Sequence, residues 1–418
     1  MEGDNKSKKH LRIAIVGCLH GNLKDVYDQI KENETTTNKK VDVLLCCGDF
    51  QAIRNKDDLR YKSCPEKYKQ MGQFQYYYNS NTPPPYLTIF IGGNHEASNL
   101  LDENFYGGWI CQNIFYMGRA GVIRYRGLRI AGISGIYNKF DFYKGHFEVD
   151  IIKHIKSIFH VREFEIVKAS HLSGDIDIFL SHDWPTGVVN KKDFPKILKI
   201  KRGWQEELYK DTLGSPASEF LLKLLKPKLW LSGHMHYTYF NDIYHNDNKK
   251  TKFMALDKTG TGKIQREFLH IFDYELLNRN ESEFSDDKIY FDSEWLAITK
   301  LFNPLIPLEE NKYDFSNFVN DQANYLNAMF ENYSINWKRK INNFIPDENF
   351  LDNLTKYRSE FASHGNKLEW NFMTGKEQRE YIINLIGIED HHKTKKKEKK
   401  EIIIEKKNIN DEEIQIEF

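Results

Sequence analysis

The sequence lacks the features of a secreted or membrane-spanning protein. Its 418 residues include only five cysteines, an odd number with no regular spacing, so a disulfide-stapled extracellular domain is not expected. The N-terminal segment is polar and has no apolar run of the kind that forms a signal peptide. No apolar run approaches the ~20 residues that a membrane helix needs. These absences predict a protein of a reducing compartment that does not bind a membrane.

The sequence also has no excess of charge of either sign. Lysine and arginine together number 60, and aspartate and glutamate also number 60, so the formal net charge is zero. Bulk charge therefore does not indicate a nucleic-acid-binding protein, and any phosphate-binding site must be local. Hydrophobic residues make up 40% of the chain, which supplies enough apolar surface for a sizeable core.

Apolar runs of strand length alternate with helical patterns up to about residue 275. Most of these runs are continuous, as is typical of strands that are buried on both faces. A hairpin is expected within Gly121–Ile136, with its turn near Arg126 and Gly127, and helices are expected over Asn22–Glu34 and Pro216–Leu225. This interleaving predicts an α/β layered domain. The runs are Leu11–Gly17, Val41–Cys47, Tyr86–Ile91, Ile176–Ser181, Lys228–Ser232, Lys252–Leu256 and Phe268–Tyr274.

The composition changes after Tyr290, where Asn, Glu, Lys and aromatic residues dominate. Helices are expected there over Asp321–Phe330 and Lys376–Ile388, and the tail from His391 is rich in charge and expected to be solvated. Its lysine cluster could act as a nuclear localisation signal, although most short lysine clusters are only solvated surface. The expected organisation is an N-terminal extension (1–10), a main α/β domain (11–290), a helical C-terminal region (291–390) and a charged tail (391–418).

Five short polar motifs each follow one of the apolar runs. The carboxyl ends of strands in an open α/β sheet face one crevice, so these motifs can converge although they lie far apart in the chain. Their imidazole, carboxylate, amide and thiol groups together suffice to hold two metal ions about 3.5–4 Å apart, bridged by Asp49. The motifs are Cys18-Leu19-His20, Gly48-Asp49, Gly93-Asn94-His95-Glu96, His182-Asp183 and Gly233-His234-Met235-His236.

Each motif also has an ordinary interpretation when it is taken alone. Gly-Asp is a common turn dipeptide, and an isolated histidine after a strand is usually a hydrogen-bonded residue of the core or surface. Cys46 and Cys47 fit buried packing positions, and Cys18 taken alone fits such a position as well as it fits a metal ligand. The metal-site hypothesis therefore depends on all five motifs occurring in order, each at the end of a strand.

The order of the motifs resembles that of the calcineurin-like metallophosphoesterases, in which Asp-x-His, Gly-Asp, Gly-Asn-His-Asp/Glu, His and Gly-His-x-His follow one another. Longer strings, among them LLCCGDFQAIRN, IGGNHEASN, GISGIYNKFDFYKGHFE and DIFLSHDWP, are similar to those of the eukaryotic RNA lariat debranching enzymes. The resemblance implies a sandwich of two mixed β-sheets flanked by helices, with a helical C-terminal appendage. It further implies a nuclear hydrolase, with the cytoplasm as a second location, that cleaves the 2′-5′ phosphodiester at the branch point of excised intron lariats.

The resemblance also assigns a role to each motif residue. His95 would face the scissile phosphate and either protonate the leaving 2′ oxygen or stabilise the transition state, next to Asn94 and Asp49. Fe²⁺, Zn²⁺ and Mn²⁺ each suit part of the ligand set. One ion would be held by Cys18, His20, Asp49 and His236, and the other by Asp49, Asn94, His182 and His234.

Branched RNA is the implied partner, and its recognition is expected from a loop at residues 134–164. This loop mixes aromatic and basic side chains, which suit unstacked bases and phosphates, although such a loop can also simply pack on its domain. Arg54 could reach a phosphate or form a surface salt bridge. The residues expected to contact substrate are Arg54, Tyr137, Lys139, Tyr143, Lys144 and His146.

Two departures from the superfamily pattern are consistent with the debranching family. Cys18 stands where an aspartate is usual, and the second motif lacks the further aspartate that pairs with the catalytic histidine in many of these phosphatases. What orients His95 is therefore open between Glu96 and a backbone carbonyl. Two alternative functions also remain open, another phosphoesterase that acts on phosphoproteins or nucleotides, and a non-catalytic RNA- or protein-binding scaffold. The presence of every expected ligand favours the enzyme.

Overall fold

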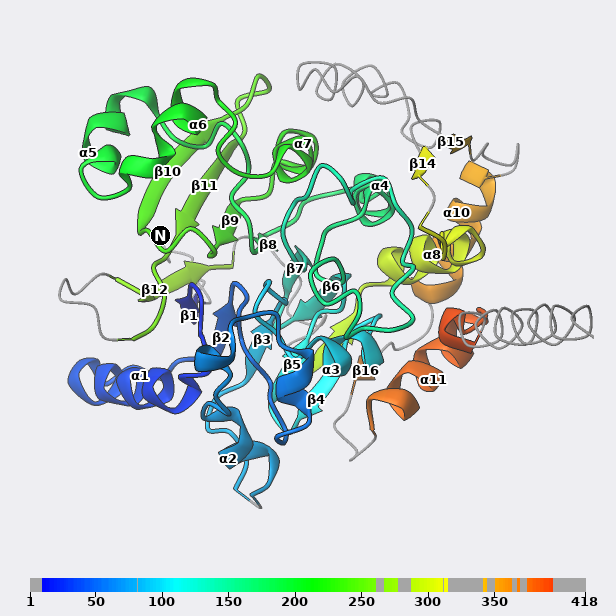
Figure 1. Cartoon of the computed structure of the whole chain (residues 1–418), viewed down its shortest axis with the longest axis horizontal. Coiled ribbons are helices and arrows are strands. Elements are labelled where there is room, and N and C mark those ends of the chain that lie inside the picture. Colours follow the sequence, from blue (N-terminus) through cyan, green and yellow to red (C-terminus); the bar gives the residue numbers. More distant parts are fainter. Residues whose placement is uncertain are drawn as a thin grey trace, which may run out of the picture.

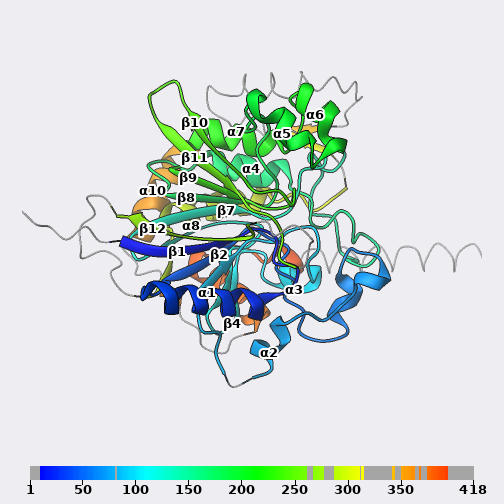
Figure 2. The same cartoon turned by 90° about the vertical axis from the view of Figure 1, so that its left-hand side faces the viewer.

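Two β-sheets lie face to face at the centre of the molecule, and helices cover their outer sides (Figure 1, Figure 2). The computed structural model describes residues 10–80, 82–260, 267–276, 287–310, 312–314, 341–343, 350–362, 367–368 and 374–393. The inner faces of the sheets form one apolar core, to which Ile13 and Phe115 contribute from the first sheet and Ile130 from the second. The predicted α/β sandwich is confirmed. Within the described ranges, no helix is both long and apolar enough to cross a membrane.

The first sheet has a parallel centre and antiparallel edges. Strands β1, β2, β3 and β5 run parallel to one another, while β12 and β4 pair antiparallel at opposite edges. Every residue of β2 and β3 is buried, as their continuous apolar sequences predict. In spatial order the strands are β12 (Leu269–Glu275), β1 (His10–Val16), β2 (Val43–Cys46), β3 (Thr88–Phe90), β5 (Ile114–Tyr116) and β4 (Gly108–Cys111).

The second sheet is also mixed, and its parallel part contains the other two motif strands, β8 and β9. The predicted hairpin is confirmed as β6 and β7, whose turn places Arg126 and Gly127 at φ 45° and 84°, as two-residue hairpin turns require. In spatial order the strands are β10 (Tyr239–Tyr244), β11 (Lys250–Ala255), β9 (Leu229–Ser232), β8 (Ile178–Ser181), β7 (Leu128–Ile133), β6 (Ala120–Tyr125), β13 (Ile289–Phe291) and β16 (Lys367–Leu368).

Helices complete the layers on both sides of the sandwich. Helix α1 (Leu23–Thr37) packs on the first sheet through Leu23, Val26 and Ile30, while α4 and α7 lie over the second sheet (Figure 2). Helix α7 spans Pro216–Leu225, as the sequence predicts, and the Ser215 side chain accepts a hydrogen bond from the Ser218 N–H at its start. The other helices are α2 (Phe74–Tyr78), α3 (Ser98–Glu103), α4 (Glu163–Ser170), α5 (Phe194–Leu198), α6 (Gln205–Tyr209), α8 (Ser293–Phe302), α10 (Phe350–Ala362) and α11 (Gly375–Ile386).

Smaller elements complete the described ranges. Strands β14 (Lys312–Asp314) and β15 (Ile341–Asn343) form a two-stranded parallel sheet. Short 3-10 helices occur at η1 (Asp58–Tyr61), η2 (Glu66–Tyr68), η3 (Lys191–Asp193), η4 (Arg202–Trp204) and η5 (Asn303–Leu305).

The seven strand-length runs of the sequence each contain a strand, namely β1, β2, β3, β8, β9, β11 and β12. The helix expected over Lys376–Ile388 is α11, whereas the one expected over Asp321–Phe330 lies outside the described residues, as does the tail from residue 394. The sequence does not predict strands β4, β5, β10, β13, β14, β15 and β16, because they are short or lack a continuous apolar run.

The C-terminal region is joined closely to the sandwich. Strand β13, in which the expected domain boundary at residue 290 falls, pairs with β6 and continues the second sheet. Arg129 of β7 binds the Asp292 carboxylate through Nε and Nη2, both at 3.0 Å, and binds the Glu294 carboxylate at 2.6 Å. Asp292 also accepts the Trp295 N–H and so caps α8. This buried ion cluster therefore fastens the start of α8 to the second sheet.

Helix α11 makes a second attachment, at the edge of the first sheet. The Gln378 side chain accepts a hydrogen bond from the Trp109 N–H at 2.6 Å and donates one to the Trp109 carbonyl at 2.7 Å. A single side chain of α11 thus hydrogen-bonds both backbone groups of a residue in edge strand β4.

Gln378→Met is expected to destabilise the fold by about 1–3 kcal/mol, because it keeps the side-chain volume but leaves two buried backbone groups unpaired. Denaturant unfolding of both proteins measures the difference. Lys376→Ala changes an exposed side chain of the same helix and should leave the unfolding midpoint near that of the wild type. Equal midpoints for Gln378→Met and the wild type would contradict the expected contribution of this contact.

Candidate metal centre

The five motifs converge at one place, where loops from both sheets meet. The loops after β1, β2 and β3 bring Cys18, Asp49 and His95 from the first sheet, and the loops after β8 and β9 bring His182 and His236 from the second. All five loops leave the carboxyl ends of parallel strands, which is the reason the sequence could predict their convergence.

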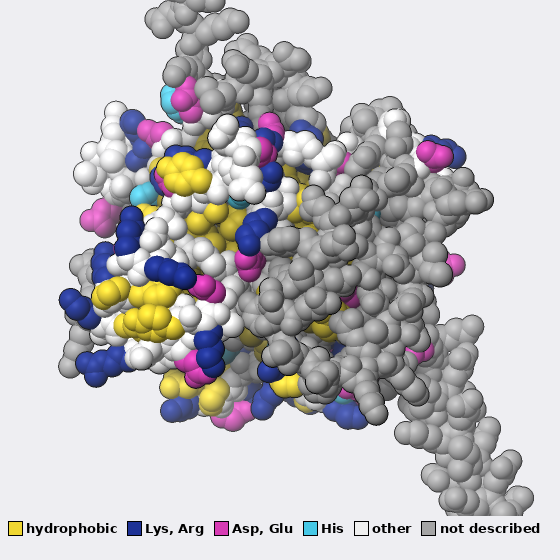
Figure 3. All heavy atoms as spheres, turned by 90° about the horizontal axis from the view of Figure 1, so that it is seen from above, with side chains coloured by type: hydrophobic (Ala, Val, Ile, Leu, Met, Phe, Trp, Pro, Cys, Tyr) yellow, Lys and Arg dark blue, Asp and Glu magenta, His cyan; other side chains and the backbone are white. Residues whose placement is uncertain are grey.

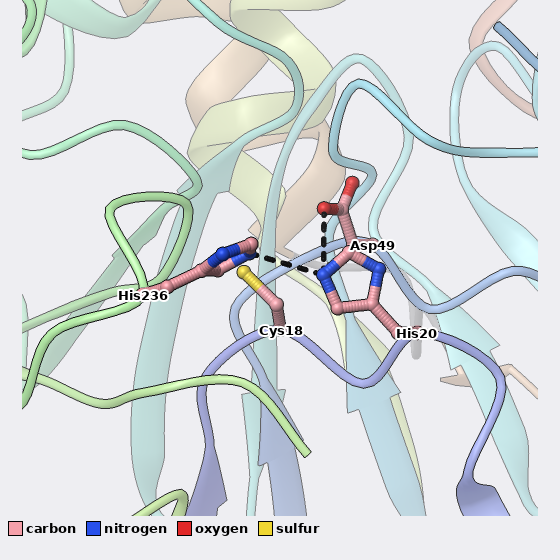
Figure 4. Close-up of side chains that lie close together, drawn as sticks. All are labelled: Cys18, His20, Asp49 and His236. Carbon is pink, nitrogen blue, oxygen red and sulfur yellow. Dashed lines mark hydrogen bonds and ion pairs between the residues drawn. The ribbon is translucent and has the colours of Figure 1, made fainter. Parts of the chain in front are cut away.

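Four ligand atoms form a compact cluster on one side of Asp49 (Figure 4). The donor atoms of Cys18, His20, Asp49 and His236 all lie within 4.8 Å of one another. His20 Nε2 is 3.0 Å from His236 Nε2 and 3.7 Å from Asp49 Oδ2. Cys18 is fully buried, and its sulfur accepts a hydrogen bond from the His234 N–H at 2.9 Å. Thiolate, imidazole and carboxylate in this arrangement can hold one divalent transition metal.

The other oxygen of Asp49 faces a second group of donors. His182 Nε2 is 3.5 Å from Asp49 Oδ1 and 3.2 Å from the Asn94 side-chain oxygen, and the His182 and His234 rings lie 4.9 Å apart. His182 Nδ1 donates a hydrogen bond to the Cys47 carbonyl at 2.7 Å, which leaves the lone pair on Nε2. Asp49 therefore stands between two donor groups, as a bridging carboxylate must.

Burial and neighbouring charges set the protonation of these groups. Burial opposes ionisation of Asp49, but His182, His20 and His95 outweigh it and hold the pKa of Asp49 below its usual range. Burial lowers the pKa of His20 to about 4 and that of His236 to about 3, so both rings are neutral near pH 7. Neutral imidazole and ionised carboxylate are the forms that bind metals. For Cys18, burial and then the Asp49 charge raise the thiol pKa, so a metal there must displace the thiol proton.

Glu96 holds two of the motif loops together. Its buried carboxylate accepts hydrogen bonds from the Phe50 N–H at 2.8 Å and the Gln51 N–H at 2.7 Å, both in the loop after β2. It also accepts one from the Gly93 N–H at 3.0 Å, in the loop after β3. Burial and the nearby Asp49 raise the pKa of Glu96 to about 7, although these N–H donors oppose the shift. Glu96 therefore braces the centre by binding backbone N–H groups, and the hydrogen bond that holds the His95 ring comes from elsewhere.

A backbone carbonyl orients His95, which resolves the alternative that the sequence left open. His95 Nδ1 donates to the Ser63 carbonyl at 2.9 Å, and the His95 N–H donates to Asp49 Oδ1 at 2.8 Å. The His95 ring lies 5.8 Å from the His20 ring, measured between centroids. The ring is thus held at the edge of the donor cluster, with Nδ1 occupied by Ser63.

The backbone at the centre is strained and tightly packed. His20, Asp49, Gln51, His234 and His236 all have φ between 45° and 61°, in the left-handed region that costs non-glycine residues ~1–3 kcal/mol each and that is common at functional sites. Two of the three motif glycines, Gly48 and Gly93, leave no room for a side chain. A Cβ on Gly93 would lie 2.3 Å from Asp49 Oδ1, and one on Gly48 would lie 2.3 Å from His182 Nδ1.

The residues expected to contact RNA have varied surroundings. Arg54 forms salt bridges with Asp58 at 2.9 Å and Glu103 at 3.0 Å. A salt bridge was the alternative to phosphate binding that the sequence left open for this residue. His146 is 1% exposed and its Nε2 is 2.7 Å from the Glu165 carboxylate. The structure therefore corrects its expected role, because a histidine packed in this way has no surface for substrate.

The other members of the 134–164 loop stay nearer to solvent. Tyr137 and Tyr143 are half-buried and pack against the core, and Lys144 pairs with Asp141 and Glu310, both at 3.0 Å. Lys139 is exposed, with its Nζ 5.1 Å from the centroid of the Phe140 ring. An aromatic ring and a cation thus stand together on the surface of this loop.

Three residues near the centre gave no signal in the sequence. Lys62 is 4% exposed, and its Nζ donates to the Gln51 side-chain oxygen at 2.8 Å. The Gln51 amide nitrogen is in turn 3.1 Å from His20 Nδ1. Ser63, next in the chain, holds His95 through its carbonyl. The contacts of these three residues depend on the path of the loop between β2 and α2. No pattern in the sequence predicts that path.

Comparisons with known proteins agree with this geometry. Residues 11–238 match the Calcineurin-like phosphoesterase family, and residues 248–391 match the family described as Lariat debranching enzyme, C-terminal domain. The chain is 44% identical over 301 residues to the lariat debranching enzyme of Arabidopsis thaliana, covering 71% of this chain and 70% of that protein. It is also 44% identical over 304 residues to that of Homo sapiens, covering 71% of this chain and 54% of that protein.

A third relative is similar over more of the chain. The lariat debranching enzyme of Drosophila pseudoobscura pseudoobscura is 37% identical over 388 residues, which covers 84% of this chain and 68% of that protein. The matched part spans little more than half of the vertebrate relatives, 54% of the human and 57% of the Xenopus laevis protein.

Proposed function

Because the chain belongs to the lariat debranching enzyme family of calcineurin-like phosphoesterases, we propose that it hydrolyses the 2′-5′ phosphodiester at the branch point of excised intron lariats. The product is linear RNA. The observation that carries the proposal is the placement of Asp49 between two donor groups, with His95 held beside them.

The donor set fits two divalent cations. The first would be held by Cys18, His20, Asp49 and His236, whose donor atoms lie within 4.8 Å of one another. The second would be held by Asp49, Asn94, His182 and His234, of which His182 already presents a lone pair on Nε2. Fe²⁺, Zn²⁺ and Mn²⁺ are the ions that suit these donors.

Two bound cations supply an activated water nucleophile and neutralise negative charge on the phosphate. The protein side chains do the rest. The Ser63 carbonyl fixes His95 at Nδ1, so Nε2 is the atom that can give a proton to the leaving 2′ oxygen. Glu96 keeps the loops of Asp49 and Asn94 at a fixed separation through three backbone hydrogen bonds. Preorganisation of this kind is needed because small misplacements are costly to the rate.

The exposed part of the 134–164 loop supports RNA recognition. Phe140 is 49% exposed, and stacking of an unpaired base on such a ring contributes ~1–3 kcal/mol. Within the same loop, His160 Nδ1 lies 2.6 Å from the Asp141 carboxylate, and the fully buried Arg162 pairs with Glu148. The loop therefore presents its aromatic and basic tip from a rigid, ion-paired base.

A substrate-comparison assay tests the proposal directly. The full chain loaded with each of Fe²⁺, Zn²⁺ and Mn²⁺ is given a branched RNA with one 2′-5′ linkage, the same RNA in linear 3′-5′ form, a phosphopeptide and a nucleotide. We expect cleavage of the branch alone. Preferred hydrolysis of the phosphopeptide or nucleotide would indicate another phosphoesterase, and a protein that takes up no metal and cleaves nothing would be a scaffold.

Cys18→Asp is expected to shift the metal preference of the first site toward Mn²⁺, because a thiolate is a softer donor than a carboxylate and favours Zn²⁺ or Fe²⁺. Competitive binding of Zn²⁺ and Mn²⁺ to the variant and the wild type measures the shift. Cys111→Ala alters another buried thiol, outside the five motifs, and should leave the preference as it is. If the ratio of Zn²⁺ to Mn²⁺ affinity is the same in Cys18→Asp as in the wild type, Cys18 is a packing residue and not a metal ligand.

A further inference from the structure

Residues 191–202, here called the basic segment, concentrate positive charge on an otherwise neutral chain. The segment lies between β8 and α7 and contains six basic residues and one acidic residue. Phe194 and Ile197 are 4% and 0% exposed and anchor α5 to the core. Because these anchors fix one face of α5, Lys192, Lys196 and Lys199 are exposed to solvent.

The C-terminal end of the basic segment lies near the metal centre. Lys201 Nζ lies 5.1 Å from the centroid of the Trp204 ring, and that ring lies 6.1 Å from the ring of Tyr237, which directly follows the ligand His236. Lys201 and Lys258 are also among the charges that lower the pKa of His236, after burial and His20. The end of the segment that contains Lys201 therefore lies on the His236 side of the metal centre.

Most of this charge is not neutralised by the protein. Lys192, Lys196, Lys199 and Arg202 form no ion pair with any residue of the described ranges, and Lys191 has only Asp211, at 3.7 Å. Ile200 and Tyr209 add apolar surface close by, 45% and 67% exposed. Seen from above, the molecule has Lys and Arg side chains set around hydrophobic ones on the side of α5 and α6 (Figure 3). Phosphates with unstacked bases match such a surface.

We propose that the basic segment binds the phosphates of the single-stranded RNA that flanks the branch point. The proposal rests on the proposed function, since it gives the same substrate a second point of contact on the His236 side of the centre. The 134–164 loop would hold the branch itself, and the segment would hold the strand that leads away from it.

The test compares a minimal branched RNA, three nucleotides long, with the same branch carrying a ten-nucleotide flank. The triple variant Lys196→Glu/Lys199→Glu/Arg202→Glu is expected to raise KM for the flanked RNA at least tenfold relative to the minimal one. The salt dependence should also weaken, because each lost contact to a single strand lowers the slope of log affinity against log salt by ~0.7, or about 2 for three contacts. The matched control is Lys24→Glu/Lys31→Glu/Lys39→Glu, which alters three exposed lysines of α1 and its C-terminal end on the other side of the sandwich (Figure 2).

The possible outcomes test RNA binding by the basic segment separately from the proposed cleavage activity. Equal KM values of the wild type for both RNAs, or an equal loss for both in the triple variant, would overturn the inference. If the wild type cleaves neither RNA, the proposed function fails, and binding of a labelled linear RNA to the wild type and triple variant still decides on the surface. Tighter binding of an acidic peptide than of RNA would assign the segment to a protein partner instead.

A second inference follows from the hydrogen bonds around His20. Lysine can only donate, so Lys62 fixes the Gln51 side-chain oxygen on its own side and turns the amide NH₂ toward His20 Nδ1, 3.1 Å away. His20 Nδ1 must then accept, which places the proton of the neutral ring on Nε2.

This proton arrangement conflicts with ligation by His20 Nε2, which needs a lone pair there and the proton on Nδ1. The proton of the His20 ring can move to Nδ1 only if the Gln51 side-chain amide rotates by a half turn. That rotation would place the amide NH₂ against the Lys62 ammonium group. We infer that Lys62 is a positioning residue that sets the metal affinity of the first site through Gln51.

A cobalt titration tests this inference without an activity assay, because the sulfur-to-cobalt absorption band reports binding at Cys18. Lys62→Met is expected to bind Co²⁺ about tenfold more tightly than the wild type, within the 10–100-fold range typical for partners of metal ligands. Lys62→Arg keeps a donor and should match the wild type. In a Gln51→Leu background, Lys62→Met should have no effect, since the amide no longer links the two residues.

Each alternative outcome contradicts the inference. An undiminished effect of Lys62→Met in the Gln51→Leu background would indicate simple charge repulsion between Lys62 and the cation. Equal affinities of Lys62→Met and the wild type would remove the positioning role. Absence of the band from the wild type would remove Cys18 from the ligands and overturn the inference together with the first site.

Discussion

His95→Ala is expected to cleave branched RNA ~10²–10⁴-fold more slowly than the wild type while it retains both metals, the range typical of a lost general acid. His95 is not needed to hold either donor group, because its ring is bound to the Ser63 carbonyl and only its backbone N–H contacts Asp49. Single-turnover cleavage at saturating enzyme measures the chemical step, and metal analysis of the same preparation measures occupancy.

His245→Ala is the matched control for this variant. His245 lies at the β10–β11 turn and hydrogen-bonds the Thr251 side chain at 2.8 Å, outside the five motifs, so its loss should leave the cleavage rate near that of the wild type. A near wild-type rate for His95→Ala would remove His95 from the mechanism. A slow variant that had also lost its metals would show that the residue supports the centre and does not donate a proton.

Arg129→Met is expected to cost about 3–5 kcal/mol of folding free energy, which is typical when one partner of a buried ion pair is removed. The substitution keeps an apolar stem of similar length but leaves Asp292, which is fully buried, and Glu294 without their main cation. Unfolding in denaturant should therefore begin at a markedly lower concentration. Lys24→Met breaks a solvent-exposed pair with Asp28 and should change the midpoint little.

Acid should narrow the difference between Arg129→Met and the wild type. Burial opposes ionisation of Asp292, but Arg129 and Arg124 hold its pKa below the ordinary value. A depressed carboxyl pKa stabilises the fold above the unfolded pKa of ~3.9, and this contribution is lost as the pH falls through the folded value. In the variant, Asp292 keeps Arg124 but has lost Arg129, so its protonation relieves a buried charge that is no longer fully neutralised. A constant difference from pH 7 to pH 3 would contradict this account.

The strands that position the centre could be predicted because they are continuous apolar runs with polar residues at their ends. Helix α4 could not, since seven of its eight residues are buried, among them Glu163, Glu165 and Lys168, which a periodicity argument assigns to a solvent face. Strands β4 and β5 are too short to stand out, and β16 exists as a strand only because β13 is beside it.

At the metal centre, too, some contacts follow from a sequence pattern and others do not. Convergence of the motif loops follows from strand order, so Cys18 and His236 could be placed together from the sequence. The Ser63 carbonyl and the Lys62–Gln51 contact depend on the path of one loop in space, and a carbonyl has no residue identity to recognise. The prediction for His146 failed for a related reason. A mixed aromatic and basic loop does not reveal which of its side chains face inward, and His146 faces Glu165.

The meeting of both sheets at one centre also sets the order in which the protein can mature. His20 and His236 are 216 residues apart in the chain, so at the usual ~5–20 residues per second of synthesis they leave the ribosome roughly ten to forty seconds apart. During that interval the strands that carry Cys18, Asp49 and Asn94 can form, but three of the seven donors, His182, His234 and His236, are added only later. Metal insertion is therefore a late event, and the nascent N-terminal half has to persist for that time with an incomplete centre.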